Sequence, residues 1–360
     1  MIEVNKIDKV NFGIIIFSAL LACILPFELF LFSYAFLGPL HYLTEINWLH
    51  NKNYFTQGKY DFIFLIVLSV CIALTFLYQD LGLTFIKPFD AFSTHFVMLG
   101  FLGAAVMVFI KNPYLKIISS ALLVFGAFLF NAEDHINYWL FFSLYLPTII
   151  HVFIFTALFM LFGAIKSKSK WGYYNVALIF VAAAILLFIR LPYQSLLPLE
   201  TIKESYSGFF MLNQFLITDV FKFFNKQELT DMAQSGKDIN EYLVFSSGGG
   251  YAVMRFIAFA YTYHYLNWFS KTSVIQWHKV SKPVLSVMII IWIASIGVYL
   301  YDYNIGLKWL FLLSFMHVLL EFPLNYHSVT GIIKGLFAGN GDTKKPTLEK
   351  VKISTKKNKR

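Results

Sequence analysis

The sequence predicts an all-α integral membrane protein, a polytopic bundle of about nine transmembrane helices, and two observations lead to this fold class. Of the 360 residues, 58% are hydrophobic and only 14% are charged, whereas ordinary globular chains are roughly 25% charged. Long apolar runs also recur along the chain, and the mean hydropathy is +0.65. A soluble fold could not cover so much apolar surface. The composition therefore excludes a soluble enzyme, a nucleic-acid-binding protein and a secreted disulfide-rich domain.

Each predicted span is an apolar run of about 20 residues or more, the length that crosses the hydrocarbon core of a bilayer. The spans lie near residues 12–37, 61–79, 91–110, 114–131, 138–165, 172–191, 251–270, 283–301 and 305–333. The first and last runs are longer than a bilayer requires, so we expect them to continue as kinked or interfacial helix. Residues 1–333 thus form the transmembrane bundle, in which the lipid bilayer is the main partner.

The placement of lysines predicts the orientation of the bundle. The segments after the first, third, fifth and seventh spans each carry several lysines, whereas the alternate short loops carry few. By the positive-inside rule, the N-terminus then lies outside and the C-terminal tail is cytoplasmic, as in a multi-pass protein of an inner or plasma membrane. Residues 334–360 are basic and polar, which is typical of a disordered tail near anionic lipid headgroups. The net charge of +9 therefore does not indicate nucleic acid as a partner.

One sizeable segment, residues 192–250, lies outside the predicted spans. Apolar residues recur there with a helical period between positions 209 and 224, with Asp219 and Lys222 among them. This pattern predicts an amphipathic helix that lies on the membrane or caps the bundle. It could form a lid over a lipid-facing entrance, or it could be a packed external hairpin.

Three histidines are predicted to lie at one depth in the bilayer. His151, His264 and His317 occur in the fifth, seventh and ninth spans, which run in the same direction. Each follows the start of its span by about 12–13 residues, which is roughly 20 Å along a helix. Ionisable side chains inside a bilayer cost about 2.5–3.5 kcal/mol each, so their presence needs a reason. Convergence on one metal ion is such a reason, and a hydrogen bond to a buried tyrosine or backbone carbonyl is the alternative.

Carboxylates accompany two histidines at the spacing of one helical turn. Glu321 follows His317 by four positions, and Glu45 follows His41 in the same way, so each pair shares a helix face. A carboxylate in this position can be a second ligand, can hold the imidazole in one tautomer, or can move a proton. Glu321 is accordingly the predicted catalytic residue. Imidazole and carboxylate together suit iron, zinc or manganese, and His95 is a further possible ligand nearer the outer surface.

Four short segments resemble the bacteriorhodopsin-related (Brp/Blh) membrane β-carotene dioxygenases. The run Gly38–Glu45 is similar to their first motif, His95 with Phe96 to the second, His264 among aromatic residues to the third, and Met316–Glu321 to the last. The resemblance implies an iron cofactor, oxidative cleavage of a carotenoid, and iron ligands on different helices. The ligands that it implies are His41, His95, His264 and His317, whereas the depth argument favours His151.

The sequence thus favours a membrane-embedded, metal-dependent oxidoreductase or dioxygenase that acts on a lipophilic substrate such as a carotenoid, an isoprenoid or a lipid. One alternative is a transporter with a polar path lined by Glu28, Arg255, His264, His317 and Glu321. Another is a structural multi-pass subunit of a larger membrane complex. A transporter is expected to contain inverted repeats, and no internal symmetry is visible. Taken individually, Glu28 and Arg255 are better explained by a structural ion pair or by snorkelling at a helix end.

Overall fold

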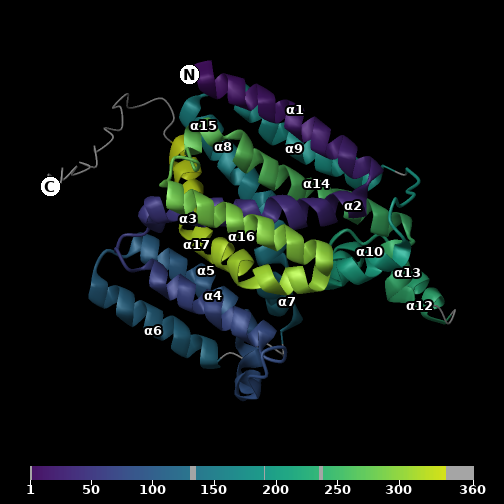
Figure 1. The fold of residues 1–360 in the computed structure, drawn as a ribbon, viewed down its shortest axis with the longest axis horizontal. Helices are drawn as coiled ribbons and strands as arrows, with labels where there is room; N and C mark the ends of the chain where they lie inside the picture. The colour runs from purple at the N-terminus through teal and green to yellow at the C-terminus, as the bar shows by residue number, and fades with distance from the viewer. Residues whose placement is uncertain (1, 130–134, 190, 235–237, 338–360) are drawn as a thin grey trace.

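The computed structural model describes residues 2–129, 135–189, 191–234 and 238–337, and every regular element in these ranges is a helix (Figure 1). The all-α fold class is therefore confirmed. Five of the described helices are long and apolar enough to cross a membrane: Asn5–Ile24, Ile136–Ser167, Lys170–Phe188, Lys282–Tyr301 and Tyr303–Phe337. A bent helix pair is a sixth candidate, and three shorter apolar helices accompany them. The count of nine spans stays a prediction.

The helices that build the bundle follow one another with short connections. In chain order they are α1 (Ile2–Ile24), α2 (Pro26–Phe32), the π-helical turn η1 (Ser33–Leu37), α3 (Gly38–Asn51), α4 (Phe62–Leu77), α5 (Ser93–Phe109), α6 (Pro113–Leu129), α7 (Ile136–Trp139), the π-helix η5 (Leu140–Phe155), α8 (Thr156–Ser167), α9 (Lys170–Phe188), α14 (Gly248–Ser270), α16 (Lys282–Tyr301) and α17 (Tyr303–Phe337). Between α9 and α14 lie the short helices α10 (Leu199–Tyr206), η6 (Ser207–Phe209), α11 (Phe210–Phe215), η7 (Leu216–Val220), α12 (Lys226–Gln234) and α13 (Ile239–Phe245).

The predicted first span, residues 12–37, is in fact two helices that run in opposite directions. The helix α1 ends at Ile24 because Pro26 has no N–H to continue the hydrogen-bond ladder. The chain then turns back through the bundle as α2, η1 and α3 (Figure 1). The prediction of one continuous or kinked span was therefore wrong at this point, and the segment that carries His41 crosses the bundle on its own.

After this reversal, the N-terminal end of α1 and the C-terminal end of α17 lie at the same end of the bundle (Figure 1). Ser169, at the start of α9, donates a hydrogen bond to Asp8 of α1. Gly335, near the end of α17, packs against Ile165 near the end of α8. The sequence predicted that the N-terminus and the tail face opposite sides of the membrane, and the side on which each lies stays a prediction. Most of the predicted tail, residues 338–360, lies outside the described residues.

The helix α14 lies at the centre of the larger of two apolar cores. It is buried along almost its whole length and packs against α1, α2, α9 and η5. The second core is formed chiefly by side chains of α4, α5 and α17. The helix α17 contacts α3, α4, α5, α8 and α16, so it joins the two cores. Side chains that point inward from α3, η5, α14 and α17 therefore meet near the middle of the bundle.

The segment between α9 and α14 caps the bundle with several short helices. The predicted amphipathic stripe over 209–224 is divided among η6, α11 and η7, and its apolar residues Phe209, Leu212 and Leu216 are buried. The ring of Phe209 lies 4.7 Å from that of Phe30 in α2. These residues therefore cap the bundle, which is one of the predicted alternatives.

Two charged residues that the sequence assigned to ion pairs or snorkelling bind backbone groups of distant segments. Arg255 is 1% exposed, and it donates hydrogen bonds to the carbonyl oxygens of Cys23, at 3.1 Å, and Leu191, at 2.6 Å. Glu28 accepts a hydrogen bond from the backbone N–H of Leu196 at 2.7 Å. Arg255 therefore satisfies backbone carbonyls at and just beyond the ends of α1 and α9, and Glu28 satisfies a backbone N–H in the connection between α9 and α10.

The bend of 54° between α13 and α14 predicts different effects for substitutions at two neighbouring glycines. A Cβ atom at Gly250 would lie 2.3 Å from the carbonyl oxygen of Leu243 and 2.4 Å from that of Val244, whereas a Cβ at Gly248 would meet no atom within 4 Å. We expect Gly250→Ala to lower the free energy of unfolding by about 1–3 kcal/mol. Thermal unfolding in detergent measures this, and Gly248→Ala is the control that should be neutral or slightly stabilising. Equal stability of the two variants would contradict the packing described here.

Candidate metal centre

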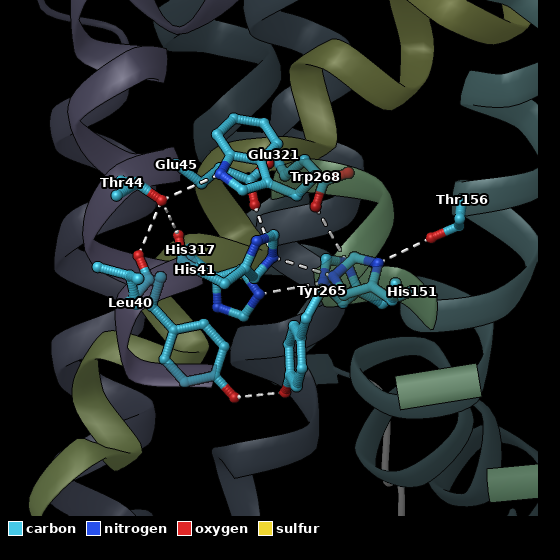
Figure 2. A network of polar contacts seen from close by, with 12 residues as sticks. Leu40, His41, Thr44, Glu45, His151, Thr156, Tyr265, Trp268, His317 and Glu321 are labelled. Carbon is cyan, nitrogen blue, oxygen red and sulfur yellow. Dashed lines mark hydrogen bonds and ion pairs between the residues drawn. The ribbon is translucent and has the colours of Figure 1, made fainter. Parts of the chain in front are cut away.

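Four histidines from four helical segments converge in the middle of the bundle, and three of them, His41, His151 and His317, are labelled in Figure 2. The four are His41 of α3, His151 of η5, His264 of α14 and His317 of α17, and each is at most 7% exposed. The Nε2 atoms of His41 and His264 are 3.0 Å apart, and those of His151 and His317 are 3.1 Å apart. The two pairs are also neighbours, because the ring centroids of His151 and His264 are 5.0 Å apart and those of His41 and His317 are 5.4 Å apart.

The spacing of the ring nitrogens fits a metal ion. Two nitrogens bound at about 2.1 Å lie about 3.0 Å apart at a right angle and about 3.4 Å apart at the tetrahedral angle. Ligand-capable atoms of His41, His264 and His317 all lie within 4.8 Å of one another. This buried group could therefore hold a metal ion, and the Nε2 atom of His151 lies next to it, 3.1 Å from that of His317.

Neighbouring side chains contact the ring nitrogens that face away from the centre. The Nδ1 atom of His264 lies 2.7 Å from the Oγ1 atom of Thr156, and the Nδ1 atom of His151 lies 3.2 Å from a carboxylate oxygen of Glu321. A histidine that binds a metal through Nε2 carries its proton on Nδ1 and donates it to such a partner, which fixes both the tautomer and the ring orientation. The contact with Thr156 thus prepares His264 to bind through Nε2, and the carboxylate of Glu321 lies beside Nδ1 of His151 as an ion-pair neighbour without a hydrogen bond of good geometry.

Glu321 contacts a different histidine from the one that its sequence spacing indicated. His317 and Glu321 do share α17, but the carboxylate lies against His151 of η5. The ring of His317 is instead stacked on Tyr42, with centroids 4.3 Å apart and an angle of 24° between the planes. Spacing along one helix predicts a shared face, but the packing of η5 against α17 decides which partner is nearest. Glu45 keeps the predicted pairing, with Oε2 3.0 Å from Nε2 of His41.

The structure brings together four of the five histidines that the sequence singled out as ligands. His151, which the depth argument favoured, lies beside His264 and His317 and joins His41 in the same cluster. The fifth, His95 of α5, is buried, and its ring packs against Phe92 and Tyr138 at centroid distances of 5.5 and 5.6 Å. The four histidines that converge are therefore those named by the depth argument or by the resemblance, except His95, which packs elsewhere.

Two cavities meet at this centre, and both reach His264. The first cavity, of about 490 Å³, contacts the centre through His41, Glu45, His264 and Glu321, and polar residues lie farther along it. Its other lining residues include Asp8, Asn11, Trp48, Phe159, Met160, Lys166, Asn267 and Lys271. The second cavity, of about 390 Å³, contacts the centre through His151, His264 and His317. Its other lining residues include Tyr34, Tyr42, Trp139, Leu144, Leu212, Tyr265, Leu307 and Phe311.

Sequence reasoning missed two residues of the centre, Thr156 and Tyr42. Thr156 contacts His264 across the interface between α8 and α14, and Tyr42 stacks on His317 across that between α3 and α17. Hydroxyl and aromatic residues are common in this chain, so neither position has a distinguishing signal. Their role follows only from the packing of helices that are distant in sequence.

Comparison with protein-family models, curated proteins and solved structures finds no match for this chain. The resemblance to the Brp/Blh membrane dioxygenases therefore depends on the short motifs alone. What the chain does must be argued from the centre and its two cavities.

Proposed function

We propose that this protein is a membrane-embedded metalloenzyme, an oxidoreductase that uses a histidine-held transition metal, iron by preference, to oxidise a lipophilic substrate. The observation that supports this function is the convergence of four buried histidines, one from each of four helical segments, with Nε2 atoms 3.0 and 3.1 Å apart in pairs. Ionisable residues in the core of a membrane protein are costly and are retained for function. Four of them around one point need a cation or a proton to balance their lone pairs.

The donor set determines which metal we propose. Imidazole nitrogens and carboxylate oxygens suit iron, zinc and manganese, and neither cysteine is among the residues that surround the centre. Bound iron would supply redox chemistry and reactivity toward dioxygen. Thr156 and Glu321 would orient His264 and His151, while Tyr42 would hold the ring of His317 in place. Glu321, which lies at the edge of the first cavity, is also the residue best placed to accept or deliver a proton there.

The second cavity is where we propose that the lipophilic substrate binds. Its volume of about 390 Å³ lies within the usual range for small-molecule sites, about 300–1,000 Å³. Its walls are mainly aromatic and aliphatic, which favours a substrate such as a carotenoid, another isoprenoid or a lipid acyl chain over a polar metabolite. Tyr34 and Tyr265 bring hydroxyl groups into this apolar wall and would orient any polar group of the substrate.

The experiment that tests this function begins with the metal content of the protein purified in detergent without chelators. We expect close to one ion of iron or another transition metal per chain. The metal-stripped protein, reloaded with Fe²⁺, should then oxidise a carotenoid or shorter isoprenoid polyene under air, detected by chromatography of the products. A protein that holds no metal as purified and takes up none when Fe²⁺, Mn²⁺ or Zn²⁺ is added would contradict the proposal.

A second function, transport of a proton or cation, is favoured by one observation. The two cavities contact different histidines and share His264, as two half-channels that meet at one residue would. The same purified protein in liposomes distinguishes the two functions. Flux of protons or metal ions that stops in His264→Ala, without oxidation of any polyene, would favour the transporter.

A further inference from the structure

We propose that Glu45 is itself a ligand of the metal ion, whereas Glu321 only positions a ligand. This inference rests on the proposed function, because it assigns a fifth donor to the same centre. The two glutamates look equivalent in sequence, since each follows a histidine by four positions. They differ in the ring nitrogen that each approaches, and this difference is the first step of the argument.

The carboxylate of Glu45 approaches the inner side of the centre. Its Oε2 atom lies 3.0 Å from Nε2 of His41, and the same Nε2 atom lies 3.0 Å from Nε2 of His264. Glu321 instead lies 3.2 Å from Nδ1 of His151, whose other nitrogen faces His317. Glu45 is therefore beside the nitrogens that face one another, and Glu321 is behind a ring.

A hydrogen atom on His41 cannot satisfy both of its close neighbours. If Nε2 of His41 carries the proton, that N–H can donate to His264 or to Glu45 but not fully to both. If Nε2 carries no proton, its lone pair faces the negatively charged carboxylate of Glu45. Among the described residues, Oε2 of Glu45 accepts no hydrogen bond of good geometry, although the residue is only 2% exposed. Oε2 of Glu321 likewise accepts no hydrogen bond. The two glutamates therefore differ in where they lie relative to the ring nitrogens, and not in whether they have a hydrogen-bond partner.

A cation between these groups resolves the conflict. It would bind beside Nε2 of His41, because Glu45 and His264 each lie 3.0 Å from that nitrogen, the separation of two donors held at about 2.1 Å and a right angle. A carboxylate ligand also neutralises one of the two charges of a divalent ion, which a set of four neutral imidazoles does not. Because Glu45 also lines the first cavity, this cavity would reach the ion along its carboxylate side.

The test compares Glu45→Gln with Glu321→Gln in the metal-stripped, full-length protein loaded with Co²⁺. Losing a ligand lowers the coordination number of Co²⁺, and a lower coordination number strengthens its visible absorption. We expect Glu45→Gln to change the intensity and wavelength of the spectrum and to weaken binding by 10²-fold or more. We expect Glu321→Gln to keep the wild-type spectrum and weaken binding by about 10–100-fold, as loss of a group that orients a ligand usually does.

An unchanged spectrum in Glu45→Gln, or a changed one only in Glu321→Gln, overturns the inference and leaves the proposed function intact. Wild-type protein that binds no Co²⁺ overturns both. If Glu45→Gln does not fold, infrared difference spectra of Glu321→Gln with and without Co²⁺ decide the question. A shift of a carboxylate stretching band on binding supports Glu45 as a ligand, and the absence of any carboxylate shift overturns it.

Discussion

Replacing His264 with alanine is expected to reduce the metal content of the purified protein from close to one ion per chain to the background level. His264 is the residue that both cavities reach, and its Nε2 atom lies 3.0 Å from that of His41. Sites with four protein ligands bind zinc with an apparent free energy of about 10–16 kcal/mol, so one ligand accounts for about 2.5–4 kcal/mol, or roughly 10²–10³-fold in affinity. Elemental analysis after dialysis measures the loss.

The control for this substitution is His278→Ala. His278 is exposed and lies beside Trp277, in the connection between α14 and α16. We expect this variant to keep all of its metal, and His317→Ala to behave like His264→Ala. A folded His264→Ala protein with wild-type metal content would show that the four histidines are a hydrogen-bonded cluster and that no ion is held there.

The convergence of three of these histidines could be predicted because it depends on few assumptions. His151, His264 and His317 lie on helices that run in the same direction, so equal distances from the helix starts give equal depths. This argument is independent of where the bundle sits relative to the membrane. It requires only that the apolar runs are helices, which their length and composition establish.

The resemblance named His41 as a ligand, but its depth in the bundle could not be predicted from the apolar runs, because it depends on what the chain does at Pro26. A proline inside an apolar run ends or kinks a helix, but a kink and a full reversal look the same in sequence. The reversal is stabilised by packing of α2 against α14, and no local pattern encodes that contact. Once the chain turns back, His41 follows Pro26 by 15 positions (41 − 26), or roughly 22 Å of helix. This distance places it in the middle of the bundle and not at the end of a span.

Contacts across helices account for the other differences between prediction and structure. Glu321 was paired with His317 because spacing along one helix is visible in sequence, and its contact with His151 is not. The same reason explains why Thr156 was missed. Sequence reasoning identified the residue types that form the centre, and the packing of η5, α14 and α17 determined which of them touch.

Replacing Arg255 with methionine is expected to destabilise the protein measurably, although Arg255 lies outside the metal centre. Arg255 is 1% exposed, and the carbonyl oxygens that it binds belong to Cys23, near the end of α1, and to Leu191, just after α9. The break at Pro26 and the end of α9 leave carbonyl groups without helical partners. A buried carbonyl that loses its partner costs about 1–3 kcal/mol. Both hydrogen bonds are partly buried and Leu191 is 45% exposed, so water can replace the guanidinium at the second carbonyl, and we expect a loss of about 1–3 kcal/mol in the free energy of unfolding.

Two matched variants separate this effect from the loss of a positive charge. Lys308→Met removes a cation that is about half exposed and pairs with Asp80 at 2.7 Å, and exposed pairs contribute about 1 kcal/mol or less. Arg255→Lys keeps the charge but replaces the two-branched guanidinium with a single ammonium group, which cannot reach both carbonyls in the same geometry. Thermal unfolding in detergent should therefore rank the proteins as wild type, Lys308→Met, Arg255→Lys and Arg255→Met, from most to least stable. If Arg255→Met is as stable as Lys308→Met, the guanidinium does not hold the ends of α1 and α9, and the reversal at Pro26 depends on apolar packing alone.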